Sequence, residues 1–257
     1  MALIEVARYE RRVHASGERV WENVRDWEHL PWLHRSSFRS IALRDEGDWG
    51  WKAEIGLRPQ GEILLELVIH GARYVSRTLE GPGAGTEIWT RVTPVGERET
   101  DVAVSFQVPE VPPEAAESLG AGFRKLYAQL WDEDEGMMEH RTRELAARAT
   151  RAEPLALGPA AKLRARLPLC VELGGRRYRV LEVGGELLAH ATRCPHLLGP
   201  LDDAAVEDGV VRCPWHGYAF DVKSGRSTEG RRLRLPPAPR VEVDADGQAT
   251  LVPASPE

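Results

Sequence analysis

Two short clusters of cysteine and histidine near the end of the chain have the residue types and spacing for metal chemistry. Cys194 and His196 form the first cluster, Cys213 and His216 form the second, and sixteen residues lie between them. A two-iron, two-sulfur cluster with mixed ligands takes two thiolates on one iron and two imidazoles on the other. A Cys2His2 zinc site is the alternative, but its paired ligands are usually two to four residues apart, and only one residue separates the first pair here. The spacing therefore favours the iron–sulfur cluster.

The sequence around both clusters has a known counterpart. The stretches CPHLLGPLDD and CPWHGYAFDVKSGR resemble the Rieske domains of bacterial ferredoxins and ring-hydroxylating oxygenases. Respiratory-chain Rieske proteins carry an extra cysteine in each loop, and this chain has none there. The resemblance implies a Rieske [2Fe-2S] cluster bound by Cys194, His196, Cys213 and His216. Short apolar or alternating runs broken by glycine turns predict a small all-β domain over residues 167–257.

A second set of metal-binding residue types lies far from the first. His29 and His34 flank Pro31, which lets the chain turn so that both imidazoles can converge. Asp134 replaces an apolar residue in the buried stripe of a long predicted helix, four residues after Leu130 and four before Met138. An inward carboxylate needs a cation, because a buried unpaired charge is costly. Two imidazoles and one carboxylate on ferrous iron leave positions open for oxygen and a substrate.

Both segments resemble parts of one enzyme family. The string from Asn23 to His34 is similar to the mononuclear-iron motif of Rieske oxygenase catalytic domains, and EDEGMME at 133–139 resembles the family's third-ligand pattern. The resemblance implies Fe(II) on His29, His34 and Asp134. It also implies a catalytic role for Asp26, which would link an iron-ligating histidine to a Rieske histidine.

An iron-free interpretation of the same residues stays open. START-like proteins without iron carry similar aromatic and proline residues in the short-helix segment, where they close a pocket. The acidic run at 132–135 is, on this view, a charged patch on a surface helix. Asp132 and Glu135 are expected to be solvated in either case.

The order of predicted elements gives an α+β fold class. The first 152 residues read as an opening strand, a helix capped by Ser16 and stopped by Pro31, six strand-like runs, and a long helix from about residue 114 to 151. That order resembles the START-like (SRPBCC) helix-grip fold, which would precede the Rieske domain. Residues 153–166, rich in Ala, Arg, Gly and Pro, predict a linker. The glycine-rich turn at 81–86 lies between strand-like runs and predicts a hairpin rather than a nucleotide loop.

The composition and the absence of certain motifs indicate which classes of partner to expect. The net charge of −6 is spread over interspersed acids and bases, which predicts no nucleic-acid surface. The sequence contains no apolar stretch of the length of a signal peptide or a membrane span, and it has only three cysteines, which fits the cytoplasm. Because no dinucleotide-binding glycine motif opens a helix, electrons are expected from an external NAD(P)H-dependent reductase or ferredoxin.

Together these features predict the terminal component of a Rieske oxygenase. The cluster would feed electrons to the mononuclear iron, which would activate O2 to oxidise a small apolar or aromatic substrate. The domain order is the reverse of the family's usual order, and the catalytic part is short for the family. We expect a homotrimer, in which one chain's cluster serves the next chain's iron. Two alternatives lack oxygen chemistry: a START-like ligand-binding domain fused to a Rieske electron-transfer module, and a START-like cyclase or dehydratase with a Rieske redox sensor.

Overall fold

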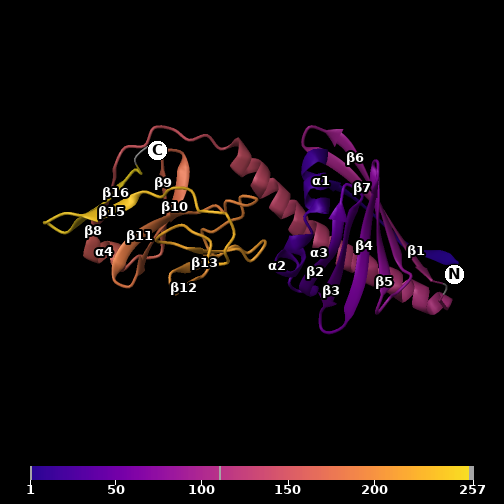
Figure 1. Cartoon of the computed structure of the whole chain (residues 1–257). Helices are drawn as coiled ribbons and strands as arrows, with labels where there is room; N and C mark the ends of the chain where they lie inside the picture. The colour runs from indigo at the N-terminus through magenta and orange to yellow at the C-terminus, as the bar shows by residue number, and fades with distance from the viewer. Residues whose placement is uncertain (1, 110, 255–257) are drawn as a thin grey trace. The chain divides into compact units, whose positions relative to one another are not determined.

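The computed structural model describes residues 2–109 and 111–254. The chain divides into two units, Met1–Thr142 and Arg143–Glu257, and both are drawn in Figure 1. None of the described helices is long and apolar enough to cross a membrane.

The first unit is built on one seven-stranded antiparallel sheet. Its strands are β1 (Leu3–Val13), β2 (Phe38–Gly47), β3 (Gly50–Leu57), β4 (Glu62–His70), β5 (Arg73–Glu80), β6 (Glu87–Gly96) and β7 (Glu99–Pro109). Their spatial order is β1-β7-β6-β5-β4-β3-β2, so β2 to β7 form a meander and β1 joins its end. Alternate residues of β7 are buried, as expected for a strand with one covered face. The glycine-rich turn at 81–86 connects β5 to β6, which confirms the predicted hairpin.

Four helical segments complete this unit: α1 (Gly17–Arg25), the 3-10 turn η1 (Trp27–His29), α2 (Leu30–Leu33) and α3 (Pro113–Ala146). The side chain of Ser16 accepts a hydrogen bond from the backbone of Arg19, which confirms the predicted N-cap. The prediction that Pro31 stops the first helix is wrong. That helix ends at Arg25, and Pro31 lies in the first turn of α2, where proline loses no helical hydrogen bond.

Helix α3 covers one face of the sheet (Figure 1). Trp131 and Met138 pack from the helix into a core that includes Trp51, Ile55 and Val92 of the strands. Near its start the helix approaches β1 so closely that a β-carbon on Gly120 would lie 2.3 Å from the carbonyl oxygen of Val6. A curved antiparallel sheet around a long final helix is the helix-grip arrangement, so the predicted START-like fold class is confirmed. The helix ends at Ala146, five residues before the predicted end near residue 151.

The second unit consists of three small antiparallel sheets. Their orders are β11-β10-β9, β12-β13-β14 and β15-β16-β8. The strands are β8 (Leu155–Pro159), β9 (Leu169–Leu173), β10 (Arg176–Val183), β11 (Glu186–Ala191), β12 (Val206–Glu207), β13 (Val210–Arg212), β14 (Ala219–Asp221), β15 (Arg240–Val243) and β16 (Gln248–Val252). One short helix, α4 (Ala160–Arg164), follows β8.

The predicted linker at residues 153–166 is part of this folded unit. It contains β8, which pairs with β16, and helix α4. Leu155 and Leu157 pack against the core of the unit, and Leu163 is one of its fully buried members. These leucines bury apolar surface that a solvated linker would expose, which is why the segment folds.

Candidate metal centres

The two cysteine–histidine loops have the same backbone architecture. In the first loop Cys194 donates its backbone N–H to the carbonyl of Gly199 over 2.8 Å, and its own carbonyl accepts from Leu198 over 3.1 Å. In the second loop the backbone of Cys213 makes the same two bonds, to Tyr218 and Gly217, each over 2.9 Å. The residue four positions after each cysteine has a left-handed backbone, with φ of 64° at Leu198 and 71° at Gly217. The two loops therefore have the same backbone conformation around their cysteines.

The four donor side chains of these loops come together. Cys194 and Cys213 are completely buried, with exposed fractions of 0% and 1%, and their thiols share a hydrogen bond. The ring centroids of His196 and His216 are 4.4 Å apart, and the two ring planes are nearly perpendicular. His196 is half-buried, whereas His216 is only 5% exposed.

The three predicted iron ligands also converge, although 100 residues separate the last two in sequence. One donor atom each from His29, His34 and Asp134 lies within 4.8 Å of the others. Nε2 of His34 is 3.2 Å from Oδ1 of Asp134, and Nε2 of His29 is 3.5 Å from the same oxygen. All three side chains are buried. Local structure brings the histidines together, because His29 ends η1 and His34 follows the single turn of α2.

Each of these three residues has a further polar partner. Nδ1 of His34 is 2.6 Å from Oε2 of Glu133, and Nδ1 of His29 is 3.5 Å from Oδ2 of Asp26. Asn23 donates to Oδ1 of Asp134 over 2.9 Å. Glu133 holds the proton on Nδ1 of His34, so that Nε2 of His34 keeps its lone pair for a metal, whereas Nδ1 of His29 makes no hydrogen bond within the described residues. Both imidazoles thus turn Nε2 toward Asp134.

Electrostatics in this cluster favour the charged forms. Burial opposes ionisation of Asp134, but the hydrogen bond and charge of His34, the charge of His29 and the hydrogen bond from Asn23 hold the pKa of Asp134 below its ordinary value. Burial likewise opposes protonation of His34, yet Asp134 and Glu133 outweigh it and raise the pKa of His34. Each group thus stabilises the charged form of the other, and a divalent cation can take the place of the imidazole proton beside the carboxylate.

The expectation that Glu135 is solvated is wrong. Glu135 is 7% exposed, because one partner from β1 and one from the residue that follows this strand cover it. Arg11 forms an ion pair with its carboxylate, and both the backbone and Nδ1 of His14 bond to Oε1, over 2.6 Å and 2.7 Å. Asp132 stays exposed and pairs with the same arginine. No feature of the helix sequence alone points to this contact, because its partners come from a segment more than 100 residues earlier.

Comparison with known proteins identifies the C-terminal unit. A family model described as the Rieske [2Fe-2S] domain matches residues 153–239. Over 77 residues, or 30% of this chain, the sequence is 34% identical to the anthranilate 1,2-dioxygenase ferredoxin subunit of Burkholderia cepacia, and the match covers 71% of that protein. The chain belongs to the Rieske [2Fe-2S] domain family. Its Rieske unit implies a [2Fe-2S] cluster.

Other matches cover smaller parts of longer proteins or a single unit. Apoptosis-inducing factor 3 of Mus musculus is 40% identical over 55 residues, which is 21% of this chain and only 9% of that protein. The first unit is similar to the crystal structure of the Zhui aromatase/cyclase from Streptomyces sp. R1128, with a TM-score of 0.49 and 14% identity. That match covers 56% of this chain and 99% of the other.

The Rieske loops fit the implied cluster in packing as well as in donor type. A β-carbon on Gly199 would lie 2.8 Å from the sulfur of Cys213 and 3.1 Å from the ring of Trp215, so the loops close around the cysteines only with glycine there. The hydrogen bond between the two thiols lowers the pKa of Cys213 to about 5 and raises that of Cys194. A thiolate is the form that binds iron, and the shared hydrogen bond favours ionisation of one thiol of the pair.

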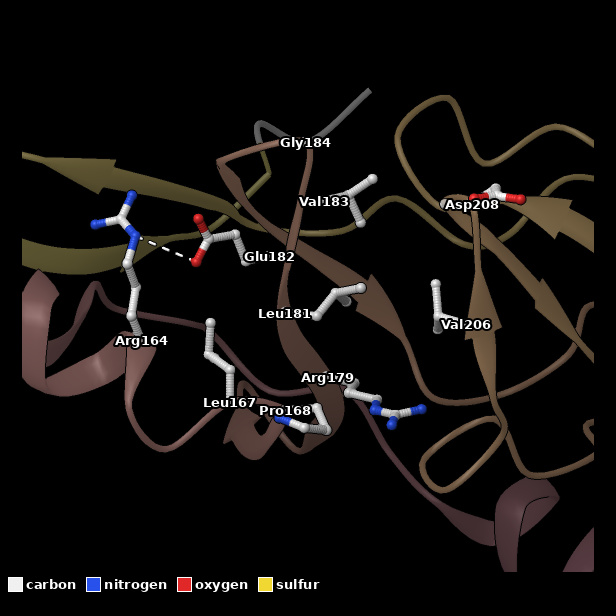
Figure 2. Close-up of a pocket in the computed structure, with 11 residues that line it drawn as sticks. Arg164, Leu167, Pro168, Arg179, Leu181, Glu182, Val183, Gly184, Val206 and Asp208 are labelled. Carbon is white, nitrogen blue, oxygen red and sulfur yellow. Dashed lines mark ion pairs between the residues drawn. The ribbon is translucent and has the colours of Figure 1, made fainter.

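A pocket elsewhere in the Rieske unit is separate from these donors. It has a volume of about 510 Å³ and lies between β10 and the hairpin of β12 and β13 (Figure 2). Leu167, Leu181 and Val206 are among its apolar walls, and the ion pair of Arg164 with Glu182, 3.2 Å long, lies at one end. None of the four predicted cluster ligands lines it. The pocket is therefore not the metal centre.

Proposed function

We propose that this protein is the terminal component of a Rieske-type oxygenase. In this proposal the [2Fe-2S] cluster of the Rieske unit supplies single electrons, and Fe(II) held by His29, His34 and Asp134 supplies the open coordination positions at which O2 reacts with a substrate. The observation that carries the proposal is the buried convergence of these three side chains. Two imidazoles and one carboxylate are the ligand set typical of oxygen-activating non-haem iron.

The remaining residues of the cluster support a metal site rather than a surface patch. Glu133 accepts the hydrogen bond at Nδ1 of His34 and orients that ring, and Asp26 lies 3.5 Å from Nδ1 of His29. Asn23 holds Asp134 from a different helix, α1. Their common effect is to keep three donor atoms directed at one point before any metal arrives, which is the arrangement that a preorganised site requires.

Aromatic groups near the site favour an apolar or aromatic substrate. Phe38 packs edge-on against His34, with ring centroids 6.2 Å apart, and Trp21 packs in the same way against Tyr74. Burial raises the pKa of Tyr74 to about 12, and it raises the pKa of Tyr127 as well. Both phenols are neutral at physiological pH, so the aromatic surroundings of the site add no charge to it.

The same proposal specifies an electron donor, an oligomeric state and a cellular compartment for this protein. Electrons would come from an external NAD(P)H-dependent reductase or ferredoxin. Asp26 would act as the catalytic bridge between an iron-ligating histidine and a Rieske histidine, and a homotrimer would bring the cluster of one chain to the iron of the next. Only three cysteines occur, two of them cluster ligands, and this fits the reducing cytoplasm.

Metal analysis of anaerobically purified protein tests the proposal. We expect three irons and two labile sulfides per chain in the parent protein. The variants His29→Ala and Asp134→Asn should each contain one iron fewer and keep the cluster spectrum. Cys194→Ser should lose the cluster instead. His70→Ala is the matched control, because His70 is exposed at the end of β4. Nitric oxide should give a ferrous nitrosyl resonance signal in the parent protein and none in His29→Ala.

Two irons per chain in the parent protein, with no added ferrous iron taken up, would overturn the proposal. The fusion of a START-like ligand-binding domain with a Rieske electron carrier would then be the function supported.

A further inference from the structure

A basic segment lies next to the second cluster loop of the Rieske unit. Between residues 226 and 234 the sequence RSTEGRRLR holds four arginines and one glutamate, in a chain whose net charge is −6. Arg226, Arg231, Arg232 and Arg234 are all exposed. The local charge therefore has the opposite sign to the charge of the whole chain.

One of these arginines is anchored to the cluster side chains. The guanidinium carbon of Arg231 lies 3.8 Å above the ring of Tyr218, and its Nη1 donates to the tyrosine hydroxyl over 2.8 Å. The ring of Tyr218 lies 4.7 Å from the ring of His196 and 5.7 Å from that of His216. A single aromatic ring thus separates the basic segment from the imidazole ligands.

Hydrogen bonds hold the basic segment in place against the cluster-binding loop. The backbone of Thr228 donates to the carbonyl of Ala219 over 3.0 Å, and the backbone of Leu235 donates to Gly225 over 2.8 Å. Arg234 donates through Nε to the carbonyl of Ser224 over 3.1 Å. These contacts fix the segment at both ends, so its charges occupy a defined surface.

The acidic groups beside this surface are already engaged. Glu229 forms an ion pair with Arg212, which also donates to the carbonyl of Gly217 in the cluster-binding loop over 2.6 Å. Asp221 accepts hydrogen bonds from the backbone and the hydroxyl of Ser224. The hydrogen bonds from serine leave the negative charge of Asp221 in place, but residues 221–234 hold five basic and two acidic side chains, so positive charge is in excess at the cluster edge.

We propose that the basic segment 226–234 is the docking surface for an acidic electron-transfer protein, which passes one electron to the cluster through the edge formed by Tyr218 and the histidines. The donor is oxidised by one electron and the cluster is reduced by one. At physiological salt, charges are screened beyond about 8 Å, so an approaching partner is attracted by the local patch rather than repelled by the distant net charge. The proposal requires the Rieske cluster and does not depend on the mononuclear iron.

Stopped-flow reduction of the full chain by a plant-type [2Fe-2S] ferredoxin, an acidic protein of lower potential, tests this docking surface. We expect the second-order rate to fall as ionic strength rises from about 0.1 M to about 1 M, over which the Debye length shrinks from about 10 Å to about 3 Å and the local patch, rather than the distant net charge, dominates. Oxidation of the reduced protein by the cation tris(phenanthroline)cobalt(III) should instead become faster with salt. A net charge of −6 acting as a whole predicts the reverse of both trends, and that result would overturn the proposal.

Charge-removing variants locate the surface. Arg226→Gln/Arg232→Gln leaves the contact of Arg231 with Tyr218 intact and should slow ferredoxin reduction roughly tenfold at low salt, within the range typical of electrostatic steering. Arg164→Gln/Arg240→Gln removes the same charge elsewhere in the Rieske unit and should change the rate less than twofold. A redox titration must show an unchanged cluster potential in both double variants. Equal losses in the two variants would refute the assignment of the surface.

Discussion

Replacing Glu133 by glutamine isolates the contribution of one carboxylate that touches no metal in the proposed site. Oε2 of Glu133 lies 2.6 Å from Nδ1 of His34, and the other oxygen accepts from Gln129 over 3.1 Å. Glutamine keeps the shape and one oxygen acceptor but removes the negative charge. The imidazole of His34 then loses the charged partner that makes its Nε2 a stronger metal donor.

The size of the effect follows from this geometry. Loss of a carboxylate behind a metal-binding histidine typically costs 10- to 100-fold in metal affinity, or about 1.4–2.7 kcal/mol. The side chain of Glu133 is 29% exposed, so water screens part of its charge. Because glutamine can also still accept the Nδ1 proton, we expect about a tenfold loss for Glu133→Gln and close to a hundredfold loss for Glu133→Ala.

Calorimetric titration with Co(II) under anaerobic conditions measures this loss on protein with an intact cluster. Glu117→Gln is the matched control, because Glu117 is exposed on the same helix, and it should bind as the parent does. Equal affinities for Glu133→Gln and the parent would refute the role of Glu133. A parent protein that binds no Co(II) would instead count against the iron site itself, so the two failures are distinguishable.

Three further predictions concern the packing of two glycines and the ionisation of one carboxylate. Gly120→Ala places a β-carbon 2.3 Å from a backbone carbonyl of β1 and should lower the free energy of unfolding by several kcal/mol. Gly122→Ala on the same helix meets no atom within 4 Å and should raise the free energy of unfolding by up to about 1 kcal/mol. Urea denaturation measures both changes. Gly199→Ala should yield folded protein with sharply reduced iron and labile sulfide, because the new methyl would lie 2.8 Å from a cluster-ligand sulfur; full cluster content would show that the loops can open. Hydrogen bonds from Ser224 lower the pKa of Asp221, so its stabilising effect is present above the ordinary carboxyl value and is lost as pH falls through the folded value. The urea midpoints of the parent and of Asp221→Asn should therefore differ at about pH 6, and the difference should shrink as the pH falls below the ordinary carboxyl value of about 4; a difference that does not shrink in acid would contradict this.

Short-range sequence patterns determine much of this protein. The cluster donors are separated by one or two residues within each loop, so their spacing alone constrains the geometry, and the family match supports that assignment. Alternating burial in β7 and the cap at Ser16 are likewise local consequences of strand and helix geometry. The apolar stripe of α3 identifies Asp134 as an inward carboxylate, and the residue is buried.

Contacts between distant segments could only be decided by the tertiary structure. The sequence predicts Glu135 in solvent because its own helix offers no partner, but Arg11 of β1 and His14, the residue after that strand, cover it. The bond from Glu133 to His34 spans 99 residues, and neither residue's neighbours predict it. The segment at 155–159 is a strand only because β16 provides the hydrogen bonds that a solvated linker would take from water. In each case the deciding free energy comes from a partner that the local sequence does not contain, because burial and pairing depend on what the fold brings alongside.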